Sequence, residues 1–200
     1  MATLHLGFLA SHGGSNMQAI IDACKAGRLD AKPCVVVSNN SEAMALQRAK
    51  NEGIPSYHIS AATHPGPLED QEILRVLRQH GVDTVILAGY MKMLGPATLR
   101  AYRGRILNIH PALLPKFGGK GMYGKRVHEA VLAAGEKVTG VSIHIVDEHY
   151  DTGPIIAQCQ VPVLPGDTVD SLAERVLKHE HALYAETLQK IADGRIALGE

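Results

Sequence analysis

Apolar runs of strand length alternate with amphipathic segments of helical length through the first half of the chain. The expected strands are the runs at 4–9, 33–37, 54–59, 82–88 and 106–110. The expected helices open at Ser15, at Ala43 and after the loop at 63–67, and the third carries Leu68, Ile73, Leu74 and Leu77 on one face. Ser15 and Gln18 have the spacing of a capping box. Buried strands that alternate with helices are typical of a parallel sheet covered on both faces.

The second half of the chain follows a different pattern. Residues 116–124 hold four glycines and no apolar periodicity, which predicts a mobile loop before a helix at 126–134. Residues 138–146 alternate between apolar and polar, so they are expected to form a strand with one buried face. Residues 154–163 can return beside that strand as its antiparallel partner.

A long amphipathic helix is expected to close the chain, capped by Asp167 or Thr168. The sequence contains no internal repeat, linker or low-complexity segment. The expected fold class is therefore α/β: one domain over residues 1–200, with an open, mostly parallel Rossmann-like sheet, helices on both faces and an antiparallel C-terminal strand pair.

The composition of the chain argues against several classes of function. Lys+Arg and Asp+Glu balance at 20 each, so no global charge attracts nucleic acid or an anionic membrane. No apolar run approaches the roughly 20 residues of a membrane helix, and no secretory leader is recognised. Cys24, Cys34 and Cys159 lack the short pair spacing of a zinc or redox site. We therefore expect a cytoplasmic protein.

Two polar side chains stand at the end of the fifth expected strand. Residues two apart on a strand point to the same side, so Asn108 and His110 leave the sheet together. Pro111 holds His110 extended. An amide donor beside a titratable imidazole suits a reaction in which a carbonyl oxygen gains charge and a proton moves. The alternative is a strand whose last polar residues make only local hydrogen bonds.

The segment His12–Asn16 connects a strand to a helix, where backbone amides and the helix dipole favour an anion. It lacks the Gly-Lys-Ser/Thr ending of a P-loop and the glycine spacing of a dinucleotide fingerprint, so a single phosphate is favoured over NAD or ATP. The alternative is a tight turn before a capped helix.

Further candidates lie on loops. Asp151 follows a strand, and a carboxylate near His110 would raise the imidazole pKa, although a solvated loop acid is the simpler interpretation. The apolar segment 87–94 suits a pocket for a flat ring or ordinary packing equally. His144 is interpreted as a structural histidine. Loop cations are expected to be solvated, with anion attraction as the minor alternative; they are Lys116, Lys120, Lys125 and Arg126.

Taken together, these motifs resemble those of the glycinamide ribonucleotide transformylases, the formyltransferases of purine synthesis that use 10-formyltetrahydrofolate. The elements that carry the resemblance occur in the same order as in that family: Gly14–Asn16, Leu87–Met91, Asn108–Pro111, Leu113–Pro115, Asp151–Pro154 and Glu180–His181. They span nearly the whole chain. Asn-x-His-Pro with a distant Asp is shared by folate-dependent formyltransferases broadly, whereas the Gly-Ser-Asn turn and the late Glu-His are more particular.

The resemblance implies roles for individual residues. The catalytic residues would be Asn108, His110 and Asp151. The substrate phosphate would be bound by Gly14, Ser15 and Asn16, and the ribose hydroxyls by Glu180. The folate pterin would be held by Met91, Lys92, Met93, Leu94, Asn108, Asp147, Glu148, His149, Tyr150 and Asp151. Substrates would be small molecules, with no metal, nucleic acid or membrane involved.

The chain departs from the family pattern at two places. Relatives often carry an arginine, thought to meet the glutamate end of folate, where this chain has Pro65–Pro67. The glycine-rich loop at 116–124 is also longer than in some relatives.

Two alternative functions follow from the same residues. Other folate-dependent formyl enzymes share the core, but the methionyl-tRNA formyltransferases add an RNA-binding domain and the formyltetrahydrofolate hydrolases a regulatory one, and 200 residues are expected to leave room for neither. A sensor that binds a phosphorylated metabolite at His12–Asn16 would show binding without turnover.

Overall fold

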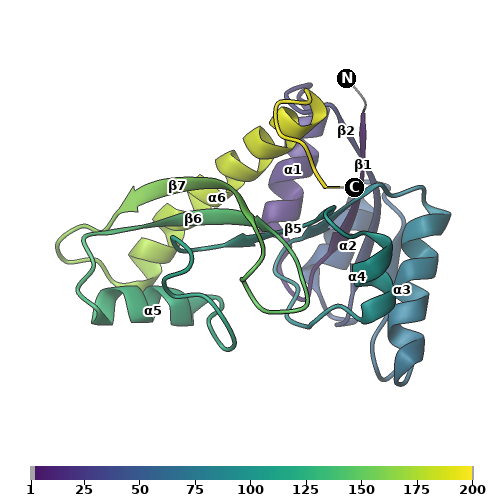
Figure 1. Ribbon diagram of the computed structural model, residues 1–200, viewed down its shortest axis with the longest axis horizontal. Coiled ribbons are helices and arrows are strands. Elements are labelled where there is room, and N and C mark those ends of the chain that lie inside the picture. Colours follow the sequence, from purple (N-terminus) through teal and green to yellow (C-terminus); the bar gives the residue numbers. More distant parts are fainter. Residues whose placement is uncertain (1–2, 200) are drawn as a thin grey trace.

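The computed structural model describes residues 3–199, and across them the chain forms one seven-stranded sheet with helices on both faces (Figure 1). In chain order the elements are β1 (Leu4–Leu9), α1 (Ser15–Lys25), β2 (Ala31–Ser38), α2 (Met44–Asn51), β3 (Ser56–His58), α3 (Pro67–Gln79), β4 (Thr84–Leu87), α4 (Pro96–Ala101), β5 (Ile106–His110), α5 (Lys125–Ala133), β6 (Val138–Ile145), β7 (Ile155–Pro162) and α6 (Val169–Ala192).

The strand order determines where a ligand can bind. The order is β3-β2-β1-β4-β5-β6-β7, with parallel pairing from β3 to β5 and antiparallel pairing from β5 to β7. The chain builds outward in one direction from β1 to β3 and in the other from β4 onward. Ligands of open α/β sheets bind beyond the carboxyl ends of the strands where the order reverses. Here that point lies between β1 and β4, next to β5.

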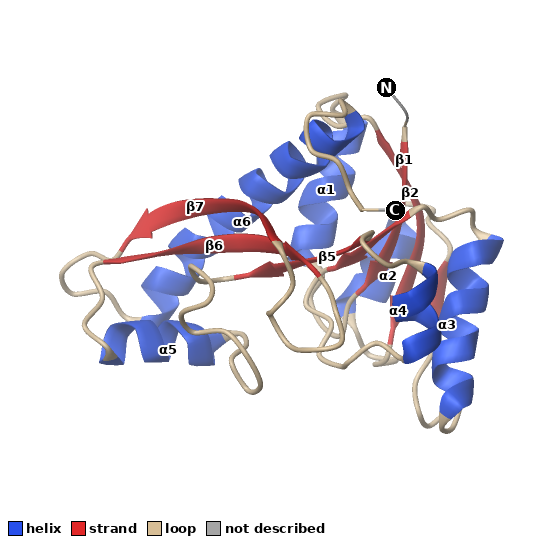
Figure 2. Cartoon of the chain, viewed as in Figure 1, coloured by secondary structure: helices blue, strands red, loops and turns tan. Residues whose placement is uncertain are grey.

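The sheet is buried on both faces, which explains why its strands are continuous apolar runs. Leu6, Phe8 and Leu107 pack in the core on the side of α1 and α6, whereas Leu9 and Ile106 pack in the core on the side of α3 and α4. Figure 2 shows these helices beside the sheet, with α1 and α6 apart from α3 and α4. Burial of each such side chain stabilises the fold by roughly 1.5–3 kcal/mol. Among the described residues no helix is long and apolar enough to cross a bilayer.

Several details differ from the sequence-based expectation. The capping box at Ser15 is wrong: Gly14 is the N-cap residue of α1, in the left-handed region at φ 68°, and no side chain caps the helix. Leu68 is 53% exposed and does not join the buried face of α3. The helix α4 was not expected, because its six residues are too few for a periodic apolar pattern. Thr168 caps α6 as expected.

Candidate active site

The last residues of β5 place two polar side chains at the carboxyl edge of the sheet. Asn108 lies in register with Leu87 on β4 and with His144 on β6. Leu107 and Ile109 face the core beneath α6, so Asn108 and His110 point to the opposite side. His110 is 3% exposed. Hydrogen bonding to strands on both sides therefore holds the pair on a rigid element.

Both ring nitrogens of His110 face acceptors. The carbonyl oxygen of Phe117 lies 2.7 Å from Nε2 and can only accept, so Nε2 carries a proton. Nδ1 lies 3.6 Å from Oδ2 of Asp151. Burial nevertheless lowers the pKa of His110 below its usual value, and Asp151 and the Phe117 carbonyl offset this only in part. Asp151 therefore raises the pKa of His110 as expected, but desolvation of a nearly inaccessible ring outweighs one carboxylate at this distance, so the net pKa is lowered.

The carboxylate of Asp151 is fixed by the loops around it. Its Oδ2 accepts from the backbone N–H of Gly119 at 3.0 Å, and its Oδ1 lies 3.3 Å from Nε2 of His144. Burial opposes ionisation, but the flanking histidines and the Gly119 amide outweigh it and lower the pKa of Asp151. Asp151 and Phe117 both have positive φ, at 56° and 55°. Such backbone strain in non-glycine residues is concentrated at functional sites.

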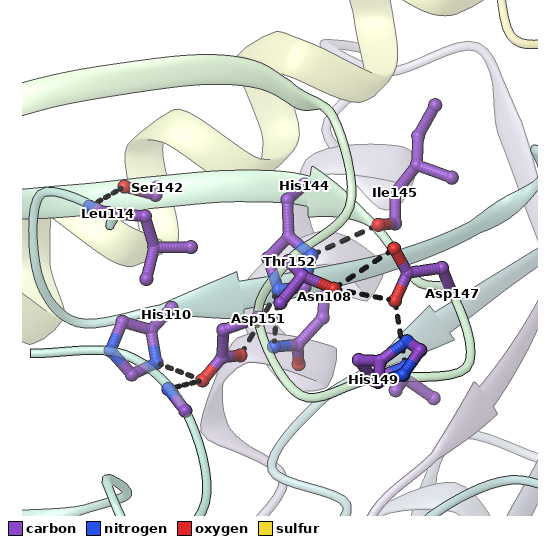
Figure 3. A network of polar contacts seen from close by, with 12 residues as sticks. Asn108, His110, Leu114, Ser142, His144, Ile145, Asp147, His149, Asp151 and Thr152 are labelled. Atoms are coloured by element: carbon purple, nitrogen blue, oxygen red, sulfur yellow. Dashed lines mark hydrogen bonds and ion pairs between the residues drawn. The ribbon is translucent and has the colours of Figure 1, made fainter. Parts of the chain in front are cut away.

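His144 joins the amide and the carboxylate, a role that the sequence did not reveal. Its Nδ1–H donates to the Ile145 carbonyl at 3.1 Å, while Nε2 lies 3.1 Å from Nδ2 of Asn108 and 3.3 Å from Asp151 (Figure 3). When Nε2 is unprotonated it accepts from Asn108, and when protonated it donates to Asp151. Nε2 of His144 therefore links the position of the Asn108 amide to that of the Asp151 carboxylate. The only signal in the sequence was the polar position in an alternating strand.

The hydroxyl of Ser142, opposite His110 on β6, shapes the chain that leaves β5. It donates to the Ala112 carbonyl at 2.7 Å and accepts from the Leu114 amide at 3.0 Å. These bonds hold the turn after Pro111 against the sheet and so keep His110 at its edge.

A cavity of about 600 Å³ opens beside this network and contains predicted substrate residues. Asn108, His110 and Asp151 line it together with Asn16 and Glu180. Nδ2 of Asn16 donates to Oε2 of Glu180 at 2.7 Å, and each residue is 8% exposed. Burial raises the pKa of Glu180 to about 7, although the bond from Asn16 works in the other direction. Oδ1 of Asn16 is buried with no hydrogen-bond partner, so it is free to receive a donor from a ligand.

Gly14 and Ser15 lie at the start of α1, next to Asn16, but do not line the cavity. The turn before them is held by α2, since Nε of Arg48 donates to the Gly13 carbonyl at 2.9 Å. A Cβ on Gly14 would lie 2.8 Å from Cβ of Ala45. Gly14 is therefore required for packing whether or not it approaches a phosphate.

The residues predicted to hold the folate surround a second, smaller cavity. Its enclosed volume is about 60 Å³, and its walls combine apolar side chains with the polar groups of Asn108 and Asp151. The predicted folate residues that line it are Lys92, Met93, Leu94, Asp147, His149 and Tyr150. Apolar walls with polar edges fit a flat heterocycle, but the enclosed volume is far below the roughly 300–1,000 Å³ of ligand pockets.

Two predicted folate residues lie elsewhere. Met91 lines the large cavity, where its backbone N–H donates to Oγ of Ser11 at 2.8 Å and so ties the loop after β4 to the end of β1. Glu148 lines neither cavity and faces a separate groove with Arg100 and Arg103. Within residues 3–199, no cluster of three or more His, Cys, Asp or Glu side chains is arranged to hold a metal ion.

The chain is similar in sequence to known formyltransferases. The sequence pattern of the formyl transferase family matches residues 5–188. A chloroplastic phosphoribosylglycinamide formyltransferase of Vigna unguiculata is 47% identical over 96% of this chain, which spans 62% of that relative's length. The phosphoribosylglycinamide formyltransferase of Escherichia coli is 40% identical over 96% of this chain and 89% of its own.

The fold is similar to that of solved structures. The crystal structure of glycinamide ribonucleotide transformylase 1 from Symbiobacterium toebii has a TM-score of 0.91 to this chain, with 40% identity over 98% of this chain and 91% of that one. The predicted fold class, a mostly parallel sheet with an antiparallel C-terminal pair, is confirmed.

Proposed function

The chain belongs to the formyl transferase family, and we propose that it transfers a formyl group from 10-formyltetrahydrofolate to the amine of glycinamide ribonucleotide, in purine biosynthesis. Residues 1–200 act as one formyltransferase domain in this proposal. We expect the protein to act in the reducing cytosol, where its three cysteines stay as free thiols. The substrates are small molecules, and the mechanism uses no metal.

The folate supplies an activated formyl group, whose carbon becomes tetrahedral when the substrate amine attacks it. Asn108 stabilises the negative charge that develops on the formyl oxygen as an N–H donor on a rigid strand end, and His110 contributes the positive charge of its ring once that ring is protonated. The low pKa of His110 means that the ring is mainly neutral before the reaction. Charge developing beside it favours protonation of Nδ1, where Asp151 then stabilises the imidazolium.

Asp151 has a second task, because the amine must lose a proton. Its lowered pKa keeps the carboxylate ionised at neutral pH, so it accepts the amine proton through water and passes it on to the folate nitrogen, which leaves as tetrahydrofolate when its bond to the formyl carbon breaks. The hydrogen bonds from His144 and Gly119 hold this carboxylate between the two cavities. Asn16 and Glu180 orient the ribonucleotide at the far end of the large cavity.

The folate ring binds in the small cavity, with its formyl group towards Asn108. Met93 and Tyr150, each 43% exposed, flank the mouth of this cavity and move aside as the ring enters. Nζ of Lys92 lies 3.6 Å from Oε1 of Glu69 on α3, so this cation on the loop after β4 already has a counter-charge.

The observation that carries the proposal is that Asn108, His110 and Asp151 meet where the two cavities adjoin. The test mixes purified protein with both substrates and follows absorbance as the folate loses its formyl group. We expect stoichiometric formation of formylated ribonucleotide. Binding of the ribonucleotide without turnover would favour a sensor, and formate release without the amine acceptor would favour a hydrolase.

A further inference from the structure

The large cavity has positive charge on a wall that the proposed chemistry does not use. The loop before α5 and the first turn of α5 bring Lys120, Lys125 and Arg126 to this wall. Lys125 is paired, with Nζ 2.6 Å from Oδ1 of Asp170. Among residues 3–199, no carboxylate lies within salt-bridge distance of Lys120 or Arg126. Two cations at the cavity therefore have no internal counter-charge.

Arg126 is the better placed of these two cations. Its guanidinium carbon lies 5.0 Å above the ring of Tyr123, and both residues line the cavity. A guanidinium that is already stacked on an aromatic ring loses less side-chain entropy when it binds an anion than an unstacked guanidinium does. Lys120 follows Gly119, whose amide binds Asp151, so it lies near the formyl-transfer end.

The opposite wall of the cavity is one face of α6, and its sequence limits where a phosphate can lie. Ala173, Leu177 and Glu180 follow one another at helical spacing and all line the cavity. Glu180 repels a phosphate dianion when ionised, and Ala173 and Leu177 offer no counter-charge. If Glu180 holds the ribose hydroxyls, the phosphate therefore needs charge from outside α6.

Arg126 can supply that charge from across the cavity. Its neighbour Lys125 is tied to Asp170, one turn before Ala173 on α6. From Asp170 to Glu180 the helix rises about 15 Å. An arginine reaching inward from one end and the start of α1 at the other can thus hold the same ribonucleotide.

We propose that Arg126 binds the phosphate of the substrate and makes the enzyme select the ribonucleotide over the unphosphorylated riboside. This inference rests on the proposed function. The planar guanidinium donates two parallel hydrogen bonds to phosphate oxygens, while Asn16 and Glu180 hold the ribose end of the same substrate. Tyr123 is the positioning residue that holds the guanidinium at the cavity.

The test compares glycinamide ribonucleotide with its dephosphorylated riboside as formyl acceptors. Arg126→Met is expected to raise the KM for the ribonucleotide about 10- to 100-fold with kcat little changed. The riboside, which lacks the phosphate, should be used by wild type and variant alike. Lys116→Met is the matched control, because Lys116 lies in the same loop but is paired with Glu136 at 2.8 Å and does not line the cavity.

Two further variants separate position from charge. Tyr123→Leu should raise the KM for the ribonucleotide less than Arg126→Met does, and Tyr123→Phe, which keeps the ring, should behave as wild type. An unchanged ribonucleotide KM in Arg126→Met, or an equal loss for both acceptors, would overturn the proposal. If wild type transfers formyl to neither acceptor, the proposed function fails. The affinity of ribose 5-phosphate for wild type and for Arg126→Met then tests the phosphate site alone. Equal affinities would overturn the proposal that Arg126 binds the phosphate.

Discussion

The two cavities of the site differ in how completely they are formed before any ligand binds. On the proposed ribonucleotide side, the helices α1 and α6 bring Asn16 and Glu180 together at 2.7 Å in a cavity of about 600 Å³. On the proposed folate side, two loops surround about 60 Å³, and Met93 and Tyr150, which line this cavity, are each 43% exposed. Asn108 and Asp151 line both cavities.

This difference follows from the elements that carry the residues. Long helices packed on a buried sheet cannot shift without losing core contacts, so they hold a preformed pocket. Loops with exposed side chains open at low cost, so they can admit a flat ring and then close over it. We therefore expect ribonucleotide binding to leave α1 and α6 nearly unchanged, and folate binding to rearrange the loops at 91–94 and 147–151.

Large effects on kcat are expected where the two sides meet. Asn108→Ala removes an oxyanion donor that both bound substrates need, so kcat should fall by about 10²–10³ while both KM values change little. Steady-state kinetics with each substrate varied in turn would measure this. A larger change in one KM than in kcat would place Asn108 on one side of the site only.

On the preformed side, Glu180→Gln should raise the KM for the ribonucleotide about tenfold, because an ionised acceptor binds hydroxyls more strongly than a neutral one. The KM for the folate should stay constant. The pKa of Glu180 is raised to about 7, so in wild type the ribonucleotide KM should rise as pH falls through 7. Glu180→Gln should lose that dependence, and the same pH profile in both proteins would contradict the assignment.

On the loop side, Met93→Asp should weaken folate binding by about 1 kcal/mol or more, roughly fivefold in Kd, since the ring would cover an unpaired carboxylate. Met44→Asp is the control, because Met44 is 56% exposed on α2 and lines neither cavity. Titration of a folate analogue measures both. Equal affinities in the two variants would place the folate pocket elsewhere.

The smallest effect is a change in the titration of His110. The carboxylate of Asp151 raises the pKa of this ring against the larger lowering by burial. Asp151→Asn should therefore move the His110 pKa further down, and NMR titration of the ring would detect the shift. An unchanged midpoint would mean that the 3.6 Å pair has no electrostatic coupling.

The sequence predicted the parallel strands because strands buried on both faces are continuous apolar runs, and the resemblance to glycinamide ribonucleotide transformylases is confirmed by the relatives. It did not reveal His144, because the register that pairs this residue with Asn108 is formed only when β6 docks on β5. The motif predicted the upward contribution of Asp151 to the pKa of His110 but not the larger lowering by burial, because burial depth depends on tertiary packing, which a motif does not encode.

The central claim is that the residues at the junction of the two cavities carry out formyl transfer. The most direct measurement is kcat for wild type and Asp151→Asn at neutral pH with both substrates saturating. The variant keeps the shape of the side chain and removes its charge, so kcat should fall by about 10²–10⁴ while both substrates still bind. A kcat equal to that of wild type in the folded variant would contradict the claim, and would leave Asp151 as a loop acid with no part in the chemistry.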